Sequence, residues 1–165
     1  MPNKVGPGRP PQSRVTRWFF RAPIKLYAVG LGSLLGGRFM LLEHIGRKSG
    51  LVRRTVIEVA KYDAESGSYY ACSGYGERSD WFQNLLAQPV AHITVRRKRM
   101  AVRARKLPPA EAGALMLDYA QRYPRTARAL VRACGYEVDG SEADWLAIGD
   151  TDMRFVEFQV DRQAR

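Results

Sequence analysis

The sequence has little of what protein-only catalysis or extracellular stability usually requires. It contains two cysteines, Cys72 and Cys134, which are far apart and form no CxxC pair, so we expect neither a disulfide framework nor a zinc site. The two histidines, His44 and His92, stand alone in candidate strands, which favours packed or hydrogen-bonded histidines over catalytic ones. GxSxG, HExxH and Walker A sequences are absent. An enzymatic function would therefore rest on a bound cofactor, and no metal site is expected.

Long uninterrupted apolar runs are also missing. The apolar stretch at residues 24–35 is broken by Lys25 and several glycines, and it falls short of the roughly twenty residues that a transmembrane helix needs. Residues 1–13 are rich in proline and glycine and are not followed by the apolar region of a signal peptide. We therefore expect a cytoplasmic protein with a disordered lead-in over residues 1–13 and a single domain over residues 14–162.

Acidic residues are scarce in the first part of the chain. Residues 1–60 hold eleven Lys and Arg against two acidic residues, and the whole chain has a net charge of +11. Nucleic acid, an anionic membrane surface and a polyanionic small molecule all suit such a field. Over residues 14–35, apolar residues recur every three or four positions among basic ones, which predicts an amphipathic helical segment broken near Pro23. This segment could make a peripheral contact with an anionic bilayer, or pack on the domain or across a dimer.

Short runs rich in β-branched and aromatic residues follow, each bounded by turn residues. They predict strands over residues 38–45, 55–62, 69–73, 91–96, 100–107 and 155–160. The links at residues 63–68 and 97–99 are short enough for antiparallel hairpins. Helices are expected over residues 80–87, from Pro109 to about Tyr123, and from Pro124 to Cys134. This order predicts an α+β fold, mainly antiparallel β, in which a small barrel or curled sheet carries flanking helices.

One basic segment bounded by glycines has the composition of an anion site. Residues 46–55, GRKSGLVRRT, join two candidate strands and bring together four cations and two hydroxyl groups. Glycines permit a tight turn with accessible amides, while Arg and Lys supply charged donors and Ser and Thr supply neutral ones. A solvated basic turn is the alternative, and the residues alone leave both open.

A second basic run, RRKR at residues 96–99, lacks interleaved aromatic side chains. Such aromatic side chains form the stacking platforms of proteins that bind single-stranded nucleic acid. Charges at the tip of a hairpin are usually just solvated. We therefore expect no nucleic-acid binding.

Three short segments occur in a characteristic order along the chain: GRKSGLVR at residues 46–53, CSGYG at residues 72–76 and DWFQNLLAQP at residues 80–89. Together they resemble the deazaflavin-dependent nitroreductase family, over about residues 14–160. The resemblance implies a split β-barrel related to the flavin-reductase and pyridoxine-phosphate-oxidase folds, and a homodimer. It also implies binding of coenzyme F420, an 8-hydroxy-5-deazaflavin whose tail carries a phosphodiester and an oligoglutamate chain. The reduced deazaflavin would deliver a hydride to an electron-poor small molecule, namely a quinone, an enone or a nitro compound.

The resemblance assigns site residues at the matching positions. Expected contacts to the phosphate and tail are Arg47, Lys48, Ser49 and Arg53, with Arg54 as a less secure neighbour. Along the ring or near the cofactor are Thr55, Val56, Ser73, Gly74, Trp81 and Asn84. Trp81 could equally be a core tryptophan.

Two positions depart from the family pattern. The nitroreductase that names the family has a Tyr-Pro-x-x-Tyr arrangement, whereas the corresponding segment here is Tyr123-Pro124-Arg125-Thr126, which argues against nitroimidazole reduction. Tyr123 could donate a proton or a hydrogen bond near the ring, as the one candidate catalytic side chain, or simply pack its helix. Gly74 stands where the family has a lysine. Two alternatives stay open: an FMN-dependent reductase on the same fold, and a non-catalytic carrier of the cofactor or of a hydrophobic ligand.

Overall fold

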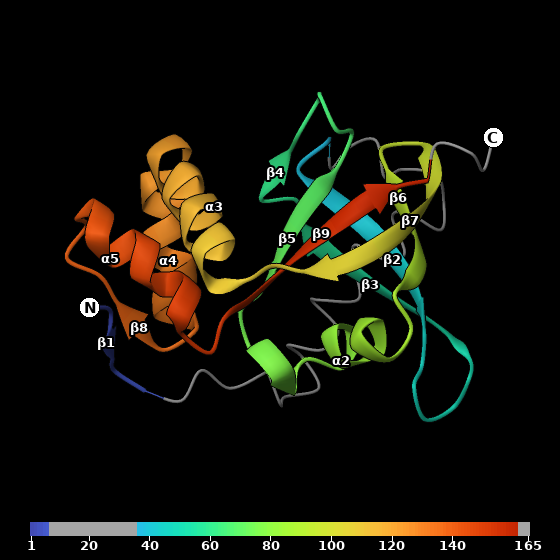
Figure 1. Cartoon of the computed structure of the whole chain (residues 1–165), viewed down its shortest axis with the longest axis horizontal. Helices are drawn as coiled ribbons and strands as arrows, with labels where there is room; N and C mark the ends of the chain where they lie inside the picture. Colours follow the sequence, from blue (N-terminus) through green and yellow to red (C-terminus); the bar gives the residue numbers. More distant parts are fainter. Residues whose placement is uncertain (7–35, 162–165) are drawn as a thin grey trace.

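A seven-stranded antiparallel sheet forms the centre of the structure, a computed structural model that describes residues 1–6 and 36–161 (Figure 1). Its strands lie in the order β3-β2-β6-β7-β9-β5-β4. Their bounds are β2 (Phe39–Ile45), β3 (Val52–Glu58), β4 (Lys61–Tyr62), β5 (Tyr69–Ser73), β6 (Val90–Val95), β7 (Lys98–Lys106) and β9 (Arg154–Val160). Along β2, Met40, Leu42 and His44 are buried and their neighbours half-buried. This alternation is typical of a strand with one covered face.

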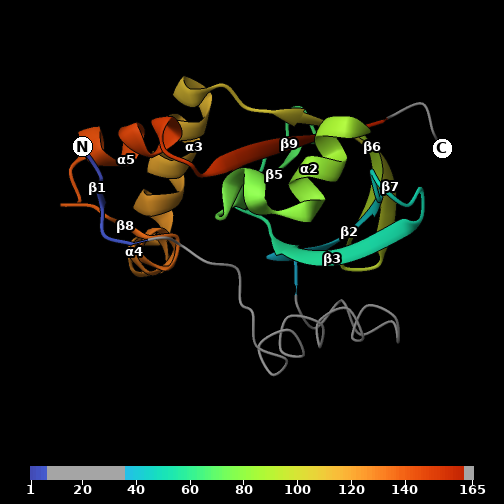
Figure 2. The same ribbon diagram turned by 90° about the horizontal axis from the view of Figure 1, so that it is seen from below.

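The link between β3 and β4 makes this sheet curl. The two strands lie at opposite edges of the sheet, yet only Val59 and Ala60 separate them in the chain. Three residue steps reach about 11 Å at most, so the two edges must meet. The main-chain N–H of Val59 donates to the carbonyl of Arg38 (2.7 Å), and that of Ala60 donates to the carbonyl of Tyr70 in β5 (2.8 Å). The fold is therefore the predicted α+β split β-barrel, mainly antiparallel, with flanking helices (Figure 2).

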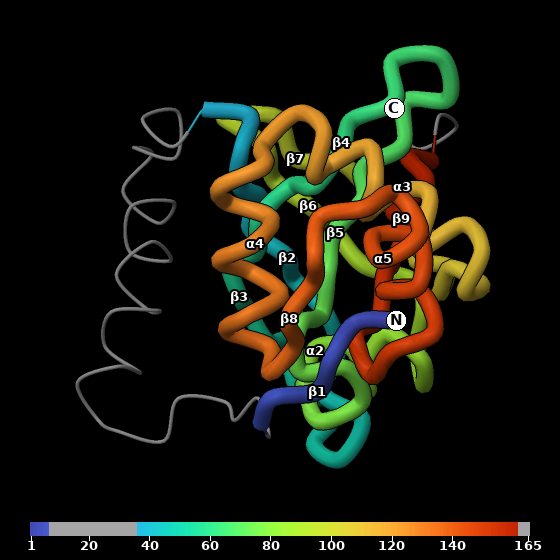
Figure 3. Tube along the Cα trace, turned by 90° about the vertical axis from the view of Figure 1, so that its left-hand side faces the viewer, coloured from blue at the N-terminus to red at the C-terminus, as the bar shows by residue number. Residues whose placement is uncertain are grey.

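Helices cover the barrel on two sides. α2 (Asp80–Ala87), preceded by the short 3-10 helix η2 (Gly76–Arg78), lies across the interior of the curled sheet (Figure 2). On the side of β5 and β9 are α3 (Pro109–Arg122), α4 (Pro124–Ala133), α5 (Glu142–Ala147) and the 3-10 helix η3 (Ile148–Asp150) (Figure 1, Figure 3). Beside them, β1 (Asn3–Lys4) and β8 (Tyr136–Glu137) form a separate two-stranded sheet. Within the described residues, no helix combines the length and apolar character needed to cross a membrane.

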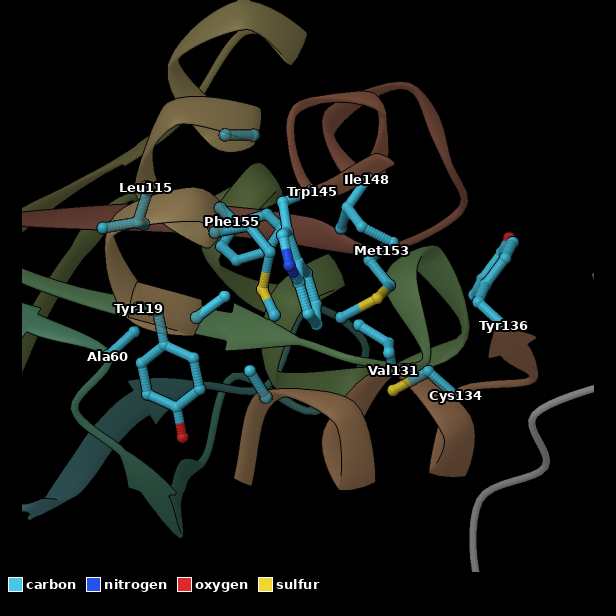
Figure 4. Close-up of a cluster of buried hydrophobic side chains, with 14 of the residues drawn as sticks. Ala60, Leu115, Tyr119, Val131, Cys134, Tyr136, Trp145, Ile148, Met153 and Phe155 are labelled. Atoms are coloured by element: carbon cyan, nitrogen blue, oxygen red, sulfur yellow. The ribbon is translucent and has the colours of Figure 1, made fainter. Parts of the chain in front are cut away.

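Two hydrophobic clusters hold these layers together. The barrel cluster joins the inward side chains of the sheet to α2, and its fully buried members include Met40, Leu42, Phe82, Ile93 and Phe158. The helical cluster joins α3, α4 and α5 to the outer face of β5 and β9, with members that include Trp145, Ile148, Met153 and Phe155 (Figure 4). Tyr69 and Ala71 of β5 pack in the barrel cluster, whereas Tyr70 and Cys72 pack against the helical cluster. This strand is therefore covered on both faces.

The predicted helices and strands agree with the structure wherever the local sequence pattern alone determines the bounds of the element. The strand over residues 69–73 and the helix over residues 80–87 have the predicted bounds, and all but one of the others shift by at most two residues. The exception is the strand predicted over residues 55–62, which was wrong. β3 begins at Val52 because Val52 pairs with Ile45, and it ends at Glu58. Lys61 and Tyr62 belong to β4, at the other edge of the sheet.

One predicted turn and one unpredicted helix also differ from expectation. The turn predicted over residues 97–99 lies one residue earlier, at Arg96 and Arg97, because Val95 and Lys98 already pair as strand residues. Arg96 has a φ of 55°, so it adopts the left-handed backbone that this tight turn requires. α5 was not predicted, although Ser141 is its N-cap: the Ser141 hydroxyl accepts the main-chain N–H three residues later (3.2 Å).

The first residues depart from the expected lead-in. Residues 3–4 form β1, and the ammonium group of Met1 lies 2.6 Å from Oδ1 of Asp144 in α5. Lys4 forms a second ion pair with Asp152 (2.6 Å). Residues 7–13 and the predicted basic helical segment over residues 14–35, with its peripheral membrane contact, lie outside the described residues.

Gly149 allows η3 to lie directly against the start of α3. A Cβ built on Gly149 would overlap the carbonyl oxygen of Pro109 and lie 2.8 Å from the main-chain nitrogen of Gly113. Because these are main-chain atoms, we expect Gly149→Ala to lower the free energy of unfolding by about 2 kcal/mol, as measured by urea denaturation. Gly37→Ala is the control, since its Cβ would lie 3.8 Å from the Arg96 side chain, an ordinary contact. Equal stability of the two variants would contradict the close packing of η3 on α3.

Candidate functional site

The loop between β2 and β3 closes on itself. The main-chain N–H of Gly46 donates to the carbonyl of Leu51 (2.8 Å), while the Gly46 carbonyl accepts from the N–H groups of Ser49 (3.1 Å) and Gly50 (2.8 Å). Gly50 has a φ of 66°, in the left-handed region that favours glycine. The loop is therefore a compact turn, and its internal hydrogen bonds use most of its amides.

Asn84 of α2 fixes this turn to the helix. Its Oδ1 accepts from the main-chain N–H of Arg47 and from Arg47 Nη1, both at 3.0 Å. The same Nη1 donates to Oδ1 of Asp80 (3.0 Å), the first residue of α2. The Arg47 guanidinium is thus turned toward the helix, and the Asp80 carboxylate balances its charge. The contact of Asp80 with Arg47 was not predicted, because Asp80 lies 33 residues further along the chain.

His44 of β2 lies against the other end of the Asn84 carboxamide. Its Nδ1 is 3.1 Å from Asn84 Nδ2, and both residues are only 4% exposed. Burial and the positive charge of Arg53 lower the pKa of His44, against an opposing effect of Asp80. His44 is the hydrogen-bonded histidine that the sequence predicted. Its membership of the site was missed, because it follows only from the pairing of His44 with Arg53 across the hairpin.

Lys48, Ser49 and Arg53 form a cluster of available donors. The side chains of Lys48 and Arg53 make no ion pair with any residue in the ranges 1–6 and 36–161, and the main-chain N–H of Lys48 has no acceptor there. Ser49 Oγ accepts from the N–H of Leu51 and from Arg53 Nη2, each at 3.3 Å. The hydroxyl hydrogen of Ser49 is therefore left to donate to another group.

The guanidinium of Arg54 is paired with a carboxylate on the face of the hairpin opposite to that of Arg53 and His44. Arg54 pairs with Glu43 across the ladder, as Arg53 pairs with His44, and neighbouring strand residues point to opposite faces. Arg54 Nε and Nη2 lie 3.0 and 2.9 Å from Oε1 of Glu43, while Arg99 of β7 donates to Oε2 (2.8 Å). Glu43 therefore holds two arginines at once, which leaves Arg54 with less free charge than its neighbour Arg53.

A cavity of about 420 Å³ lies between the β2–β3 hairpin and α2. It brings together eight of the residues that the sequence predicted: Arg47, Lys48, Ser49, Arg53, Arg54, Thr55, Trp81 and Asn84. His44, Gly46 and Asp80 complete its lining. Trp81 is half-buried, its ring stands edge-on to that of Phe82 with the centroids 6.2 Å apart, and it packs against the barrel cluster. Trp81 is therefore both a core residue and part of the cavity wall.

Val56 and Ser73, which were also predicted to contact the cofactor, lie outside this lining. Val56 follows Thr55 along β3 and so faces the other side of the strand. Ser73 is 2% exposed. Its Oγ lies 3.0 Å from the carbonyl oxygen of Gly76 and 2.7 Å from Oγ of Ser79. The Ser73 hydroxyl is thus occupied within the protein, where it closes the turn that leads into η2.

Gly74 and Tyr123, at the two departures from the family pattern, are also absent from the cavity lining. Any Cβ on Gly74 would overlap Sγ of Cys134, so the packing of α4 leaves no room for a lysine. The guanidinium groups of Arg38 and Arg122 lie over the ring of Tyr123, 5.6 and 5.5 Å from its centroid. Arg38 precedes β2, at the end of the hairpin opposite the loop. The structure therefore does not bring Tyr123 together with the loop.

The donor cluster fits a polyanionic organic group. Phosphodiester and carboxylate oxygens only accept hydrogen bonds, and the cluster offers the ammonium and amide of Lys48, the guanidinium of Arg53 and the hydroxyl of Ser49. The one carboxylate in the lining, that of Asp80, is paired with Arg47. Across residues 1–6 and 36–161, no three His, Cys, Asp or Glu side chains are grouped to hold a metal ion. The residues present thus suit an F420 tail.

Solved structures of known proteins share this architecture at low identity. HutZ, described as a heme storage protein from Vibrio cholerae, is 11% identical over 87% of this chain and 91% of that chain, with a TM-score of 0.53. A structure described as a domain-swapped dimer is 18% identical over 87% and 98% of the two chains, with a TM-score of 0.52. An F420-H2 dependent reductase, FDR-A, is 18% identical over 73% and 93%, with a TM-score of 0.49. The first two show a shared fold alone. No curated protein matches the chain.

A family model identifies the chain more specifically. The model, described as F420H(2)-dependent quinone reductase, matches residues 15–132. This match covers well over half of the chain and includes the loop, α2 and the cavity between them. F420H2 is the reductant in the family's description, so the FMN alternative is not needed. The chain belongs to the F420H2-dependent quinone reductase family and is an oxidoreductase that uses the deazaflavin F420H2 as its reductant.

Proposed function

We propose that this chain transfers a hydride from reduced F420 to an electron-poor small molecule, with quinones as the first acceptor class and enones and nitro compounds as further candidates. One observation carries the proposal: Lys48, Ser49 and Arg53 offer unpaired donors in a cavity whose wall continues to Thr55 and Trp81. Reduced F420, when bound, supplies the hydride. The family's description supports quinones as the first class.

In this proposal the chain's own residues bind and orient rather than form covalent bonds. Lys48, Ser49 and Arg53 hold the phosphate and the anionic tail through charge-assisted hydrogen bonds. Thr55 and Trp81 form the wall where the ring lies, and the half-buried indole keeps water from that side. Arg54 and Ser73 have a structural role in this proposal and do not bind the cofactor. The polar group of Arg54 is paired with Glu43, and that of Ser73 is hydrogen-bonded to Ser79.

The choice between a reductase and a carrier can be tested directly. We expect F420H2 to be oxidised when it is mixed with the protein and menadione, at a rate proportional to protein concentration, as followed by the cofactor's absorbance. Cyclohexenone and a nitroimidazole complete the panel, and the nitroimidazole should react slowest because Thr126 replaces a tyrosine of the family pattern. Binding of F420 without oxidation by any member of the panel would identify a carrier and refute hydride transfer.

Removal of the two unpaired cations should weaken F420 binding. The double variant Lys48→Ala with Arg53→Ala loses two charge-assisted donors, each worth about 1.5 kcal/mol or more, so we expect the Kd to rise at least tenfold. Fluorescence titration with F420 at two salt concentrations measures the effect. The control, Arg97→Ala with Lys98→Ala, removes the same charge at the turn between β6 and β7 and should change the Kd less than threefold. Equal losses in the two double variants would show general charge attraction instead of a site.

We propose further that the chain forms a homodimer through the outer face of the β2–β3–β6 sheet. Leu51, Val52 and Val90 are 61%, 59% and 48% exposed, and the strand register places Val52 and Val90 on either side of Ile45. Such an exposed apolar row suits an interface. A similar structure is described as a domain-swapped dimer, which supports the proposal.

Light scattering after size-exclusion chromatography tests the dimer. We expect a mass of twice 18.6 kDa, and a shift to the single-chain mass in the variant Val52→Glu with Val90→Glu, because two buried charges oppose the interface. Tyr62→Glu is the control, since Tyr62 is 53% exposed on the distant edge strand β4. A single-chain mass for the unaltered protein would refute the dimer.

A further inference from the structure

The carboxamide of Asn84 is buried and takes part in three hydrogen bonds within the protein. Its Oδ1 accepts two hydrogen bonds from Arg47, one from the main chain and one from the side chain, both at 3.0 Å. Its Nδ2 lies 3.1 Å from Nδ1 of His44. Asn84 therefore connects three segments: α2, the loop and β2. Both lone pairs of its Oδ1 are used, and one hydrogen of its NH₂ group is left for a ligand.

The hydrogen bonds fix which way this amide points. A main-chain N–H can only donate, so Arg47 requires Oδ1 of Asn84 on its side. The amide must then present its NH₂ group to His44, whose Nδ1 has to accept. A neutral imidazole that accepts at Nδ1 carries its hydrogen on Nε2. The hydrogen bond from the Arg47 main chain to Asn84 therefore requires the Nε2–H tautomer of His44, and this tautomer in turn favours that hydrogen bond.

The charged groups that face His44 come from every neighbouring element. Arg53 of β3 is its partner across the ladder, Arg47 and Lys48 belong to the loop that lines the same cavity, and Asp80 lies at the start of α2. On the β6 side the neighbouring inward residues, Ala91 and Ile93, are apolar. Burial and Arg53 lower the pKa of His44, and Asp80 opposes them in part.

We propose that Asn84 and His44 are positioning residues of the cofactor site, because neutral His44 orients the Asn84 carboxamide, which in turn holds Arg47 and the loop in the anion-binding conformation. The inference rests on the proposed function. A second proton on His44 places an N–H group against the NH₂ group of Asn84. Two donors then face each other, and they repel. Rotation of the Asn84 amide, so that Oδ1 faces His44, removes this repulsion but breaks both hydrogen bonds from Arg47.

The pH dependence of F420 binding expected from this network is opposite in direction to that expected from charge alone. An added positive charge at His44 attracts an anionic tail, so charge alone makes binding stronger as the pH falls. Disruption of the loop makes binding weaker. We expect the Kd for F420 to rise between pH 8 and pH 5.5, by less than about tenfold, because the lowered pKa of His44 leaves part of the imidazole neutral at pH 5.5.

Two substitutions at the network separate these cases. His44→Gln keeps an acceptor for Asn84 but does not titrate, so its Kd should stay constant from pH 8 to pH 5.5, whatever its value at pH 8. Asn84→Asp still accepts from Arg47 but cannot donate to His44, so it should favour a hydrogen on Nδ1 and raise the pKa of His44. His92→Gln is the control, because His92 lies on β6 outside the cavity lining, and its pH profile should equal that of the unaltered protein.

Nitrogen-15 NMR of the histidine rings, recorded on the full chain without cofactor, gives a readout that does not depend on F420. We expect His44 to show the Nε2–H tautomer at pH 8 and the Nδ1–H form in Asn84→Asp. The Nδ1–H tautomer in the unaltered protein overturns the network. A Kd that does not rise at low pH, or the same rise in His44→Gln, overturns the positioning role alone. Failure to bind F420 at any pH overturns the proposed function and the positioning role together.

Discussion

The antiparallel pairing of β2 with β3 is the constraint on which the rest of the site depends. Ile45 opposite Val52 leaves six residues for the loop, so the turn must close on Gly46. The same register puts His44 beside Arg53 on the inner face and Glu43 on the outer face. A slip of one residue would exchange these faces, bury a carboxylate in the barrel and expose the imidazole. The packing of the barrel cluster therefore also sets the chemistry of the cavity.

Local patterns predicted much of this fold, and long-range pairing decided the remainder. Residues 69–73 alternate and are bounded by turns, so their strand was predictable without knowledge of its partners. Residues 55–62 also have strand composition throughout, but their two halves pair with strands at opposite edges of the sheet. No local property marks the break at Val59 and Ala60. The turn at Arg96 was predicted one residue too late for a similar reason, since only the pairing of Val95 with Lys98 forces an arginine into a left-handed backbone.

The candidate site shows the same division between composition and geometry. Composition predicted that residues 46–55 gather cations and hydroxyls, and most of them line one cavity. Which of these cations are free could not be predicted, because their acidic partners come from other elements. Asp80 lies 33 residues beyond Arg47, and Glu43 reaches Arg54 only through the strand register. Likewise, Asn84 was expected as a ligand contact, whereas its hydrogen bonds to Arg47 and His44 show how its amide is used.

Charge and shape at the loop are controlled by different groups. Lys48 and Arg53 are exposed, so dissolved salt screens their attraction for an anion. The Asn84 side chain is buried, its contact with His44 is buried and its bonds from Arg47 are partly buried, so salt has less access to them. The lowered pKa of His44 keeps a third like charge away from Arg53 near neutral pH. Rising ionic strength should therefore weaken the hold on an anionic tail without deforming the turn that receives it, whereas a change at His44 acts on the turn itself.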